Sequence, residues 1–187
     1  SFVSDDHRAG VYLFGMVKDR DAYDRNDDGF SDITRLRSET VGFRGYYKTS
    51  AHSRLSAEYH HIHDFRRGGD NLDAAPHMAM LCEQVDHIID GGGLKFDYLP
   101  NTKHRASAYA SAQNISRASY FGADMDPNAY GTTRDFTVVG GGQYTLNYMC
   151  GVPTELTAGI EYNYNELNDY YTATNRKLDQ NTSTLGL

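Results

Sequence analysis

The chain has 187 residues with 15 Tyr, 18 Gly, only 4 Pro and no Trp, a composition that favours strands and turns over helices. Its formal net charge of -7 argues against a nucleic-acid partner, because phosphate binding needs clustered Lys and Arg. The longest nearly continuous apolar stretch, residues 11–17, falls far short of the roughly 18 residues that a transmembrane helix needs. These observations predict an all-β protein.

Alternation of apolar and polar residues with a period of two predicts about seven strands. They are residues 9–19, 36–49, 54–66, 84–98, 104–120, 134–149 and 154–171. The pattern is clearest in 134–149, where Val138, Tyr144 and Leu146 alternate with Thr137 and Gln143. Strands of soluble domains usually have about five or six residues, whereas a tilted strand needs roughly 9–11 to cross a bilayer. The lengths therefore favour an antiparallel meander that forms part of a transmembrane β-barrel.

The predicted connections alternate between short turns and long polar loops. Short turns are expected at 49–53, 99–103 and 150–153, and long loops at about 20–35, 67–83 and 121–133. This sorting is typical of outer-membrane barrels, in which the two ends of the barrel differ in loop length. It places Cys82 in a long loop and Cys150 in a short turn, at opposite ends of the strands. Because a disulfide requires Cα atoms about 6 Å apart, two unpaired thiols are predicted.

The polar sides of the strands would line the lumen of such a barrel. The residues predicted to face the lumen are Tyr46, Glu58, Lys95, Tyr109, Gln113, Gln143, Glu161 and Asn163. Aromatic residues near the ends of the apolar sides would form interfacial girdles, as at Phe65, Tyr98, Tyr148 and Tyr164. The alternative is that these rings are ordinary strand aromatics in a β-core.

Several sequence runs resemble the barrel of TonB-dependent outer-membrane receptors of Gram-negative bacteria. They are residues 58–70, the pair Pro76-His77, and residues 86–93, 109–113, 126–131 and 156–162. The resemblance implies a 22-stranded barrel with a plug domain through which TonB drives active uptake of a scarce nutrient, such as a siderophore-iron complex, haem, cobalamin or a glycan. Nothing in the chain resembles the plug, and seven strands cannot close that barrel. We therefore expect an internal segment of a longer protein in the cell outer membrane.

The first long loop contains the run Asp24, Asn26, Asp28, Phe30 and Asp32, with Gly29 between Asp28 and Phe30. Oxygen ligands at every second position and Gly at the sixth match the first half of an EF-hand loop, in which Phe30 would offer its carbonyl group. The bidentate Glu at the twelfth position is absent, since Arg35 occupies it. The run predicts a Ca²⁺ site, with a solvated acidic turn as the alternative.

Arg66 and Arg67 lie where the third predicted strand ends, so their guanidinium groups could bind lipopolysaccharide phosphates or an anionic substrate. Ion pairs with Asp64, Asp70 or Asp73 are the alternative. A transition-metal site is not expected at His60, His61 and His63, because His60 points away from the other two in a strand.

Three functions remain open from the sequence. The first is a segment of a nutrient receptor that binds outer-membrane lipid and lipopolysaccharide, contacts TonB through its plug and takes up a small ligand. The second is a secreted soluble β-sandwich that binds glycan through Tyr-rich loops. The third is an outer-membrane barrel hydrolase. No GxSxG motif and no nucleophile with an adjacent base are found, so no enzymatic activity is predicted.

Overall fold

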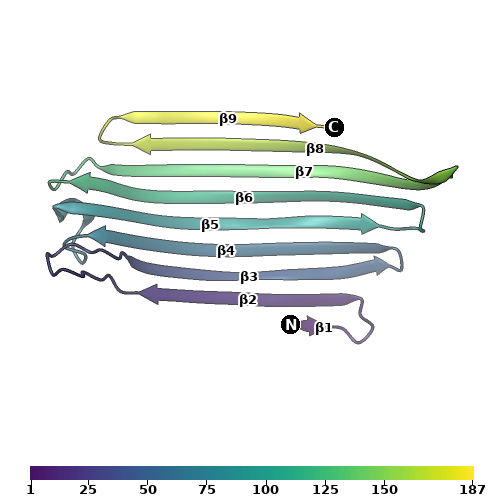
Figure 1. The fold of residues 1–187 in the computed structure, drawn as a ribbon, viewed down its shortest axis with the longest axis horizontal. Helices are drawn as coiled ribbons and strands as arrows, with labels where there is room; N and C mark the ends of the chain where they lie inside the picture. Colours follow the sequence, from purple (N-terminus) through teal and green to yellow (C-terminus); the bar gives the residue numbers. More distant parts are fainter.

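The computed structural model describes residues 1–187 as one antiparallel sheet of nine strands that pair strictly in chain order (Figure 1). The strands are β1 (Phe2–Val3), β2 (Ala9–Arg20), β3 (Arg35–Ser50), β4 (Ser53–Gly69), β5 (Leu81–Tyr98), β6 (His104–Ala123), β7 (Tyr130–Cys150), β8 (Val152–Tyr171) and β9 (Arg176–Gly186). A single 3-10 turn, η1 (Pro76–Met78), lies between β4 and β5. The sheet is one layer and is not closed, because β1 and β9 each pair on one side only.

The all-β antiparallel meander is confirmed, with nine strands in place of about seven. Each of the seven predicted segments lies within an observed strand, and the observed strands mostly extend further at the loop end. The strands β1 and β9 were not predicted from the sequence. The polar run of β9 lacks apolar alternation, but its backbone pairs with the free edge of β8 from Glu161 to Tyr171. Backbone pairing does not depend on side-chain hydrophobicity, so the pattern gave no signal there.

The connections are sorted by length, although less sharply than predicted. At one end they are residues 21–34, 70–80, 124–129 and 172–175, and at the other 4–8, 51–52, 99–103 and 151 (Figure 1). We call these the loop end and the turn end. The third long loop, predicted at 121–133, is shorter because β7 already begins at Tyr130, which pairs with Tyr120, and β6 continues to Ala123 by pairing with β5. Gly151 alone connects β7 to β8, and its φ of 75° favours glycine there.

The register defines two faces, since direct partners in neighbouring strands point to the same side. One face carries a band of apolar side chains, here called the apolar band: Leu13, Phe43, Leu55, Ala57, Leu94, Phe96, Ala108, Ala110, Ala112, Val138, Tyr144, Ile160 and Tyr162. We call this side the apolar face and the opposite side the polar face. The four aromatic residues predicted for the girdles, Phe65, Tyr98, Tyr148 and Tyr164, all lie on the apolar face.

Few residues are buried, because a single sheet leaves both faces open. Only 13 of 187 residues are buried, and the buried hydrophobic ones are Ala79, Cys82, Tyr120 and Ala129. Large members of the apolar band are exposed instead, with Leu13 at 69% and Leu94 at 56%. The structure contains no helix that is long and apolar enough to span a membrane.

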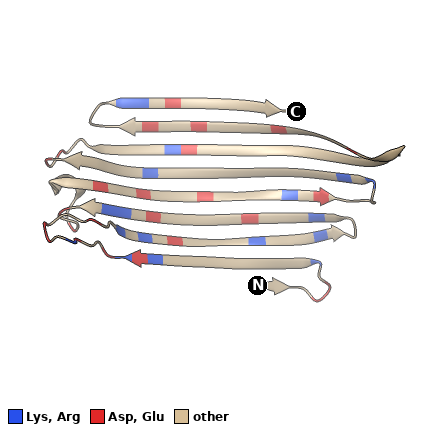
Figure 2. Cartoon of the chain, in the orientation of Figure 1, with Lys and Arg blue, Asp and Glu red and all other residues tan.

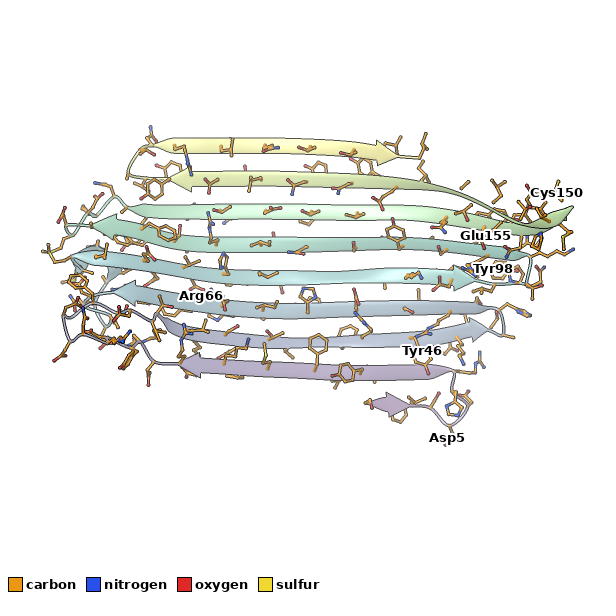
Figure 3. The ribbon with its side chains drawn as sticks, viewed as in Figure 1. Asp5, Tyr46, Arg66, Tyr98, Cys150 and Glu155 are labelled. Atoms are coloured by element: carbon orange, nitrogen blue, oxygen red, sulfur yellow. The ribbon has the colours of Figure 1, made fainter.

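Both cysteines are free, as predicted, and they lie at opposite ends of the sheet. Cys150 is exposed at the turn end (Figure 3). The prediction that Cys82 lies in a loop is wrong, because Cys82 is part of β5 and is fully buried at the loop end.

Candidate functional site

The residues predicted to face a lumen share the polar face of the sheet. The register joins them in rows across neighbouring strands: Tyr46 pairs with Ser56, Ser56 with Lys95, and Lys95 with Tyr109. The same row reaches Glu161, a neighbouring row contains Glu58 and Asn163, and Gln113 and Gln143 lie in two further rows of this face. Alternation therefore predicted correctly which residues share a face, because the register is continuous through the parts of the strands that carry them, and its one irregularity, between Tyr47 and Ser50, lies beyond them.

The polar face is hollowed between β3 and β6. A shallow trough of about 340 Å³ there is flanked by Arg44, Glu58, Lys95 and Tyr109, with small residues such as Ser111 along its floor. A second hollow of about 230 Å³ continues towards the loop end. We call the two hollows together the polar trough.

The charged groups of the polar trough are paired within the chain. Arg44 and Glu58 form an ion pair with 2.7 Å between Nη2 and Oε2, and Lys95 Nζ lies 3.0 Å from an Asp97 carboxylate oxygen. Tyr109 donates a hydrogen bond from its hydroxyl group to Glu161 on β8. The trough thus offers both acceptors and donors, with little uncompensated charge.

Several rings lie flat on the polar face because their direct cross-strand partner is glycine. Tyr109 covers Gly141, where an added Cβ would lie 2.9 Å from the Tyr109 hydroxyl oxygen. His60 covers Gly91 in the same way, at 2.7 Å from its imidazole. A ring that lies flat over a glycine projects little from the polar face and fills the space that the missing side chain leaves.

A row of apolar residues crosses the polar face between the polar trough and the loop end. Its apolar members are Met16, Ile62, Ile89, Ile115 and Leu167, and the polar Thr40 and Asp135 occupy its positions on β3 and β7. Beyond it lies a charged row, in which Arg117 donates to Thr133 at 2.7 Å and Thr133 donates to Asp169 at 2.6 Å. None of these apolar residues was among those predicted to face the lumen, because Ile62, Ile115 and Leu167 are flanked by polar residues, and Met16 and Ile89 lie next to other apolar residues that point to the opposite face.

Arg66 and Arg67 do not form one site. Arg66 lies on the polar face near the loop end (Figure 3), where its Nε donates to Asp64 at 2.8 Å. Arg67 lies on the opposite face and is only 2% exposed, donating to Gln84 at 3.0 Å and to the Asn71 carbonyl at 3.1 Å. Adjacent residues in a strand point in opposite directions, so the two guanidinium groups cannot bind one anion together.

The acidic loop folds through backbone hydrogen bonds to its own carboxylates. Asp24 accepts from the backbone N–H groups of Asp27 and Gly29 at 2.8 Å, and Asp28 accepts from that of Phe30 at 2.9 Å. Asn26 donates to Asp28, and Asp32 accepts from the Arg25 backbone. No cluster of three or more His, Cys, Asp or Glu side chains is arranged to hold a metal ion in this structure. The calcium site stays a prediction.

The histidines divide between the faces as expected. His60 lies on the polar face, whereas His61 and His63 lie on the apolar face beyond the apolar band. There His61 Nδ1 is 2.8 Å from Asp90 Oδ1, and His63 Nε2 is 2.8 Å from Asp86 Oδ1. The side called the apolar face therefore carries apolar side chains towards the turn end and polar side chains towards the loop end.

A small core, which was not predicted from the sequence, fixes the second loop against the loop end of the sheet. Ala79, Cys82, Tyr120 and Ala129 form this core, with Tyr130 packed against it. The rings of Tyr120 and Tyr130 meet edge to face, 4.9 Å between centroids. These residues come from three separate stretches of the sequence, 79–82, 120 and 129–130, so no local pattern could reveal that they meet.

Asp70 anchors the same loop. Its carboxylate accepts hydrogen bonds from the backbone N–H groups of Leu81 at 2.8 Å and Met80 at 3.1 Å. Desolvation would raise the pKa of the Asp70 carboxyl group, but the hydrogen bonds from Leu81 and Met80 outweigh it and hold that pKa below its ordinary value. The charged form of Asp70 therefore stabilises the closed loop.

Comparison of the chain with family models, with curated proteins and with solved structures finds no match.

Proposed function

We propose that this chain is a wall segment of an outer-membrane β-barrel that belongs to a TonB-dependent nutrient receptor. The observation that carries the proposal is the exposed apolar band on one face of a single-layered sheet whose opposite face is polar. A contiguous apolar surface of this kind needs a partner, because leaving it in water is unfavourable. In a barrel the hydrocarbon of the bilayer is that partner.

The dimensions of the apolar band fit a bilayer. On β7 every second residue from Phe136 to Tyr148 is apolar or glycine. At about 3.3 Å per residue this run is roughly 40 Å long, and a strand tilt of about 40° reduces its height to roughly 30 Å. That height equals the thickness of a bilayer hydrocarbon core, about 30 Å.

Charge along the strands supports the same placement. Between Arg105 and Arg117 no residue of β6 is charged, and β7 carries no charge after Asp135 (Figure 2). Charged residues concentrate towards the loop end, where barrel strands project into water. A soluble sandwich would need a second sheet to cover the apolar band, and this chain uses all its strands in one sheet.

The receptor class rests on the resemblance of the sequence runs described above, since the fold alone is compatible with any large outer-membrane barrel. In that class further strands would close the barrel, the polar face would line the lumen, and TonB would act through a plug. The transported ligand would be a small, scarce nutrient, and the chain itself would have no enzymatic activity.

Location and folding of the full-length protein test the barrel. We expect it in the outer-membrane fraction, soluble only with detergent, and with an electrophoretic mobility that changes on boiling, as for closed barrels. A compact monomer in detergent-free buffer would support the glycan-binding sandwich instead.

Uptake tests the receptor. A strain that lacks the full-length protein should lose uptake of one nutrient at low concentration, and an uncoupler should abolish the same uptake in the wild type. Energy-independent uptake, or substrate hydrolysis by the purified protein, would contradict a TonB-dependent receptor and would favour a passive pore or a barrel hydrolase respectively.

A further inference from the structure

A polar depression lies on the apolar face, just beyond the apolar band. It has a volume of about 300 Å³ and lies across β6 to β9 near the loop end. Its lining on this face includes Ser116, Arg134, Asn168, Lys177 and the acidic Asp179, which is the direct partner of Asn168 on β9. We call it the exterior depression, because the apolar face would be the outside of the proposed barrel.

Arg134 is the uncompensated charge of the exterior depression. The ion pairs of this region join Arg117 and Arg176 to Asp169, and Lys177 to Asp179, and none of them involves Arg134. The Arg134 side chain is exposed, and its direct partner on β8 is the neutral Asn168. Because Lys177 is paired with Asp179 at 2.8 Å, the net positive charge on this side of the depression comes from Arg134, which lies among several neutral hydrogen-bonding groups.

An apolar hollow of about 370 Å³ lies on the same face, within the apolar band. Gly92, Ala110 and Ala112 leave space between the larger Phe43 and Val138. Small residues on an otherwise bulky surface make a groove in which hydrocarbon can lie against the wall.

The two features are placed as the two parts of one amphiphile would require. Ala112 lines the apolar hollow and Ser116 lines the exterior depression, and both lie on the apolar face of β6. Four residues along a strand correspond to about 13 Å. The acyl chains of one leaflet extend about 15 Å, half the hydrocarbon core, so a single chain reaches from one feature to the other.

We propose that the exterior depression binds the phosphate of a membrane lipid, with Arg134 as the principal contact and an acyl chain directed towards the apolar hollow. Arg suits this role because its planar guanidinium group donates two parallel hydrogen bonds to phosphate oxygens. Lys177 and Asn168 supply additional donors at the rim. The inference rests on the proposed barrel, since only there do the apolar band and a lipid leaflet lie side by side.

The test uses the full-length protein in neutral detergent micelles that contain phosphatidic acid, or diacylglycerol with the same acyl chains. Native mass spectrometry counts the lipid retained by the protein. We expect wild type to retain phosphatidic acid in preference to diacylglycerol, and Arg134→Gln to reduce the retention of phosphatidic acid roughly tenfold. Lys177→Gln should reduce it by a smaller factor, and it serves as the second variant if Arg134→Gln does not fold.

Arg37→Gln is the matched control. Arg37 lies on the same face and in the same cross-strand row as Lys177, but it is paired with Glu39 and lies outside the depression. Its retention of phosphatidic acid should match wild type. Equal retention by Arg134→Gln and Arg37→Gln, or equal retention of both lipids, would overturn the proposal.

Inorganic phosphate added at millimolar concentration distinguishes the source of the anion. Displacement of phosphatidic acid by free phosphate would overturn the lipid assignment in favour of a site for a soluble anion. If the protein is found in the outer membrane while Arg134→Gln has no effect, the lipid site fails and the barrel stands. If the protein is soluble without detergent, the barrel itself fails.

Discussion

The two faces of the sheet differ in where their side chains find partners. On the polar face, Arg44 pairs with Glu58 and Tyr109 with Glu161, and rings cover the glycines between the strands. On the apolar face, Leu94 and Ile160 are more than half exposed and find no such partner in the chain. The charged side chains of the polar trough are thus paired within the chain, whereas the apolar band depends on its surroundings. The same strands produce both results because their side chains alternate.

Substitutions at Val138 and Val139 test most directly whether the two faces meet different surroundings, and the largest effect is expected there. They are neighbours with identical side chains, but Val138 lies in the apolar band and Val139 beside the polar trough. Val138→Arg should destabilise the protein in a bilayer by about 2 kcal/mol, because the charge would face lipid. The loss of stability caused by Val139→Arg should be only a few tenths of the loss caused by Val138→Arg. Denaturant titration in lipid vesicles measures both, and equal costs would mean that the two faces meet similar environments.

Gly141 and Gly140 test how the polar face is packed. A Cβ at Gly141 would meet the Ile160 carbonyl oxygen at 2.7 Å and the Tyr109 ring, so Gly141→Ala should destabilise by about 1.5 kcal/mol. At Gly140, on the apolar face, the nearest atom would be 3.5 Å away, and Gly140→Ala should be close to neutral. Thermal unfolding in micelles compares them. A neutral Gly141→Ala would show that Tyr109 does not need to lie flat.

The reactivity of Cys82 tests the apolar face at the loop end, where the second loop covers it. Cys82 should react with an aromatic disulfide reagent far more slowly than Cys150, since only Cys150 is exposed. Asp70→Asn removes the charged acceptor for Leu81 and Met80, at a cost of about 1 kcal/mol, and should speed the labelling of Cys82 several-fold.

The same loop should respond to pH in one direction. Because the folded pKa of Asp70 lies below its ordinary value, its stabilising contribution is complete above about pH 4 and is lost as the pH falls through the folded value. Labelling of Cys82 relative to Cys150 should therefore rise on acidification in wild type and change little in Asp70→Asn. A parallel rise in both proteins would assign the opening to other groups.

The acidic loop carries the smallest expected effect. If it binds Ca²⁺, the incomplete ligand set should give a dissociation constant of roughly 10⁻⁴ to 10⁻³ M. Calorimetry should then show binding that Asp28→Asn removes and Asp27→Asn keeps, because Asp27 is not among the predicted ligands. Absence of heat with wild type would leave the loop as a turn closed by its own hydrogen bonds.

The sequence predicted the faces better than it predicted the ends. Alternation is a local property, so it identified seven strands and grouped Tyr46, Lys95 and Tyr109 on one side. It could not find β9, whose pairing depends on the edge of β8, nor the core around Tyr120, whose members come from separate segments. It also placed Arg66 and Arg67 in one candidate site, although alternation itself separates them.

By itself the sequence determined the class of fold, the length of most strands and the side on which each residue lies. The reason is that consecutive residues of a strand point to opposite faces, so the alternation of apolar and polar residues can be recognised locally. Only the tertiary structure decided the register, since the rows across the sheet depend on how each hairpin closes. The register in turn brought Tyr109 over Gly141, buried Cys82 beneath a loop and set Arg134 beyond the apolar band. Those contacts join residues far apart in the chain, and no local pattern encodes them.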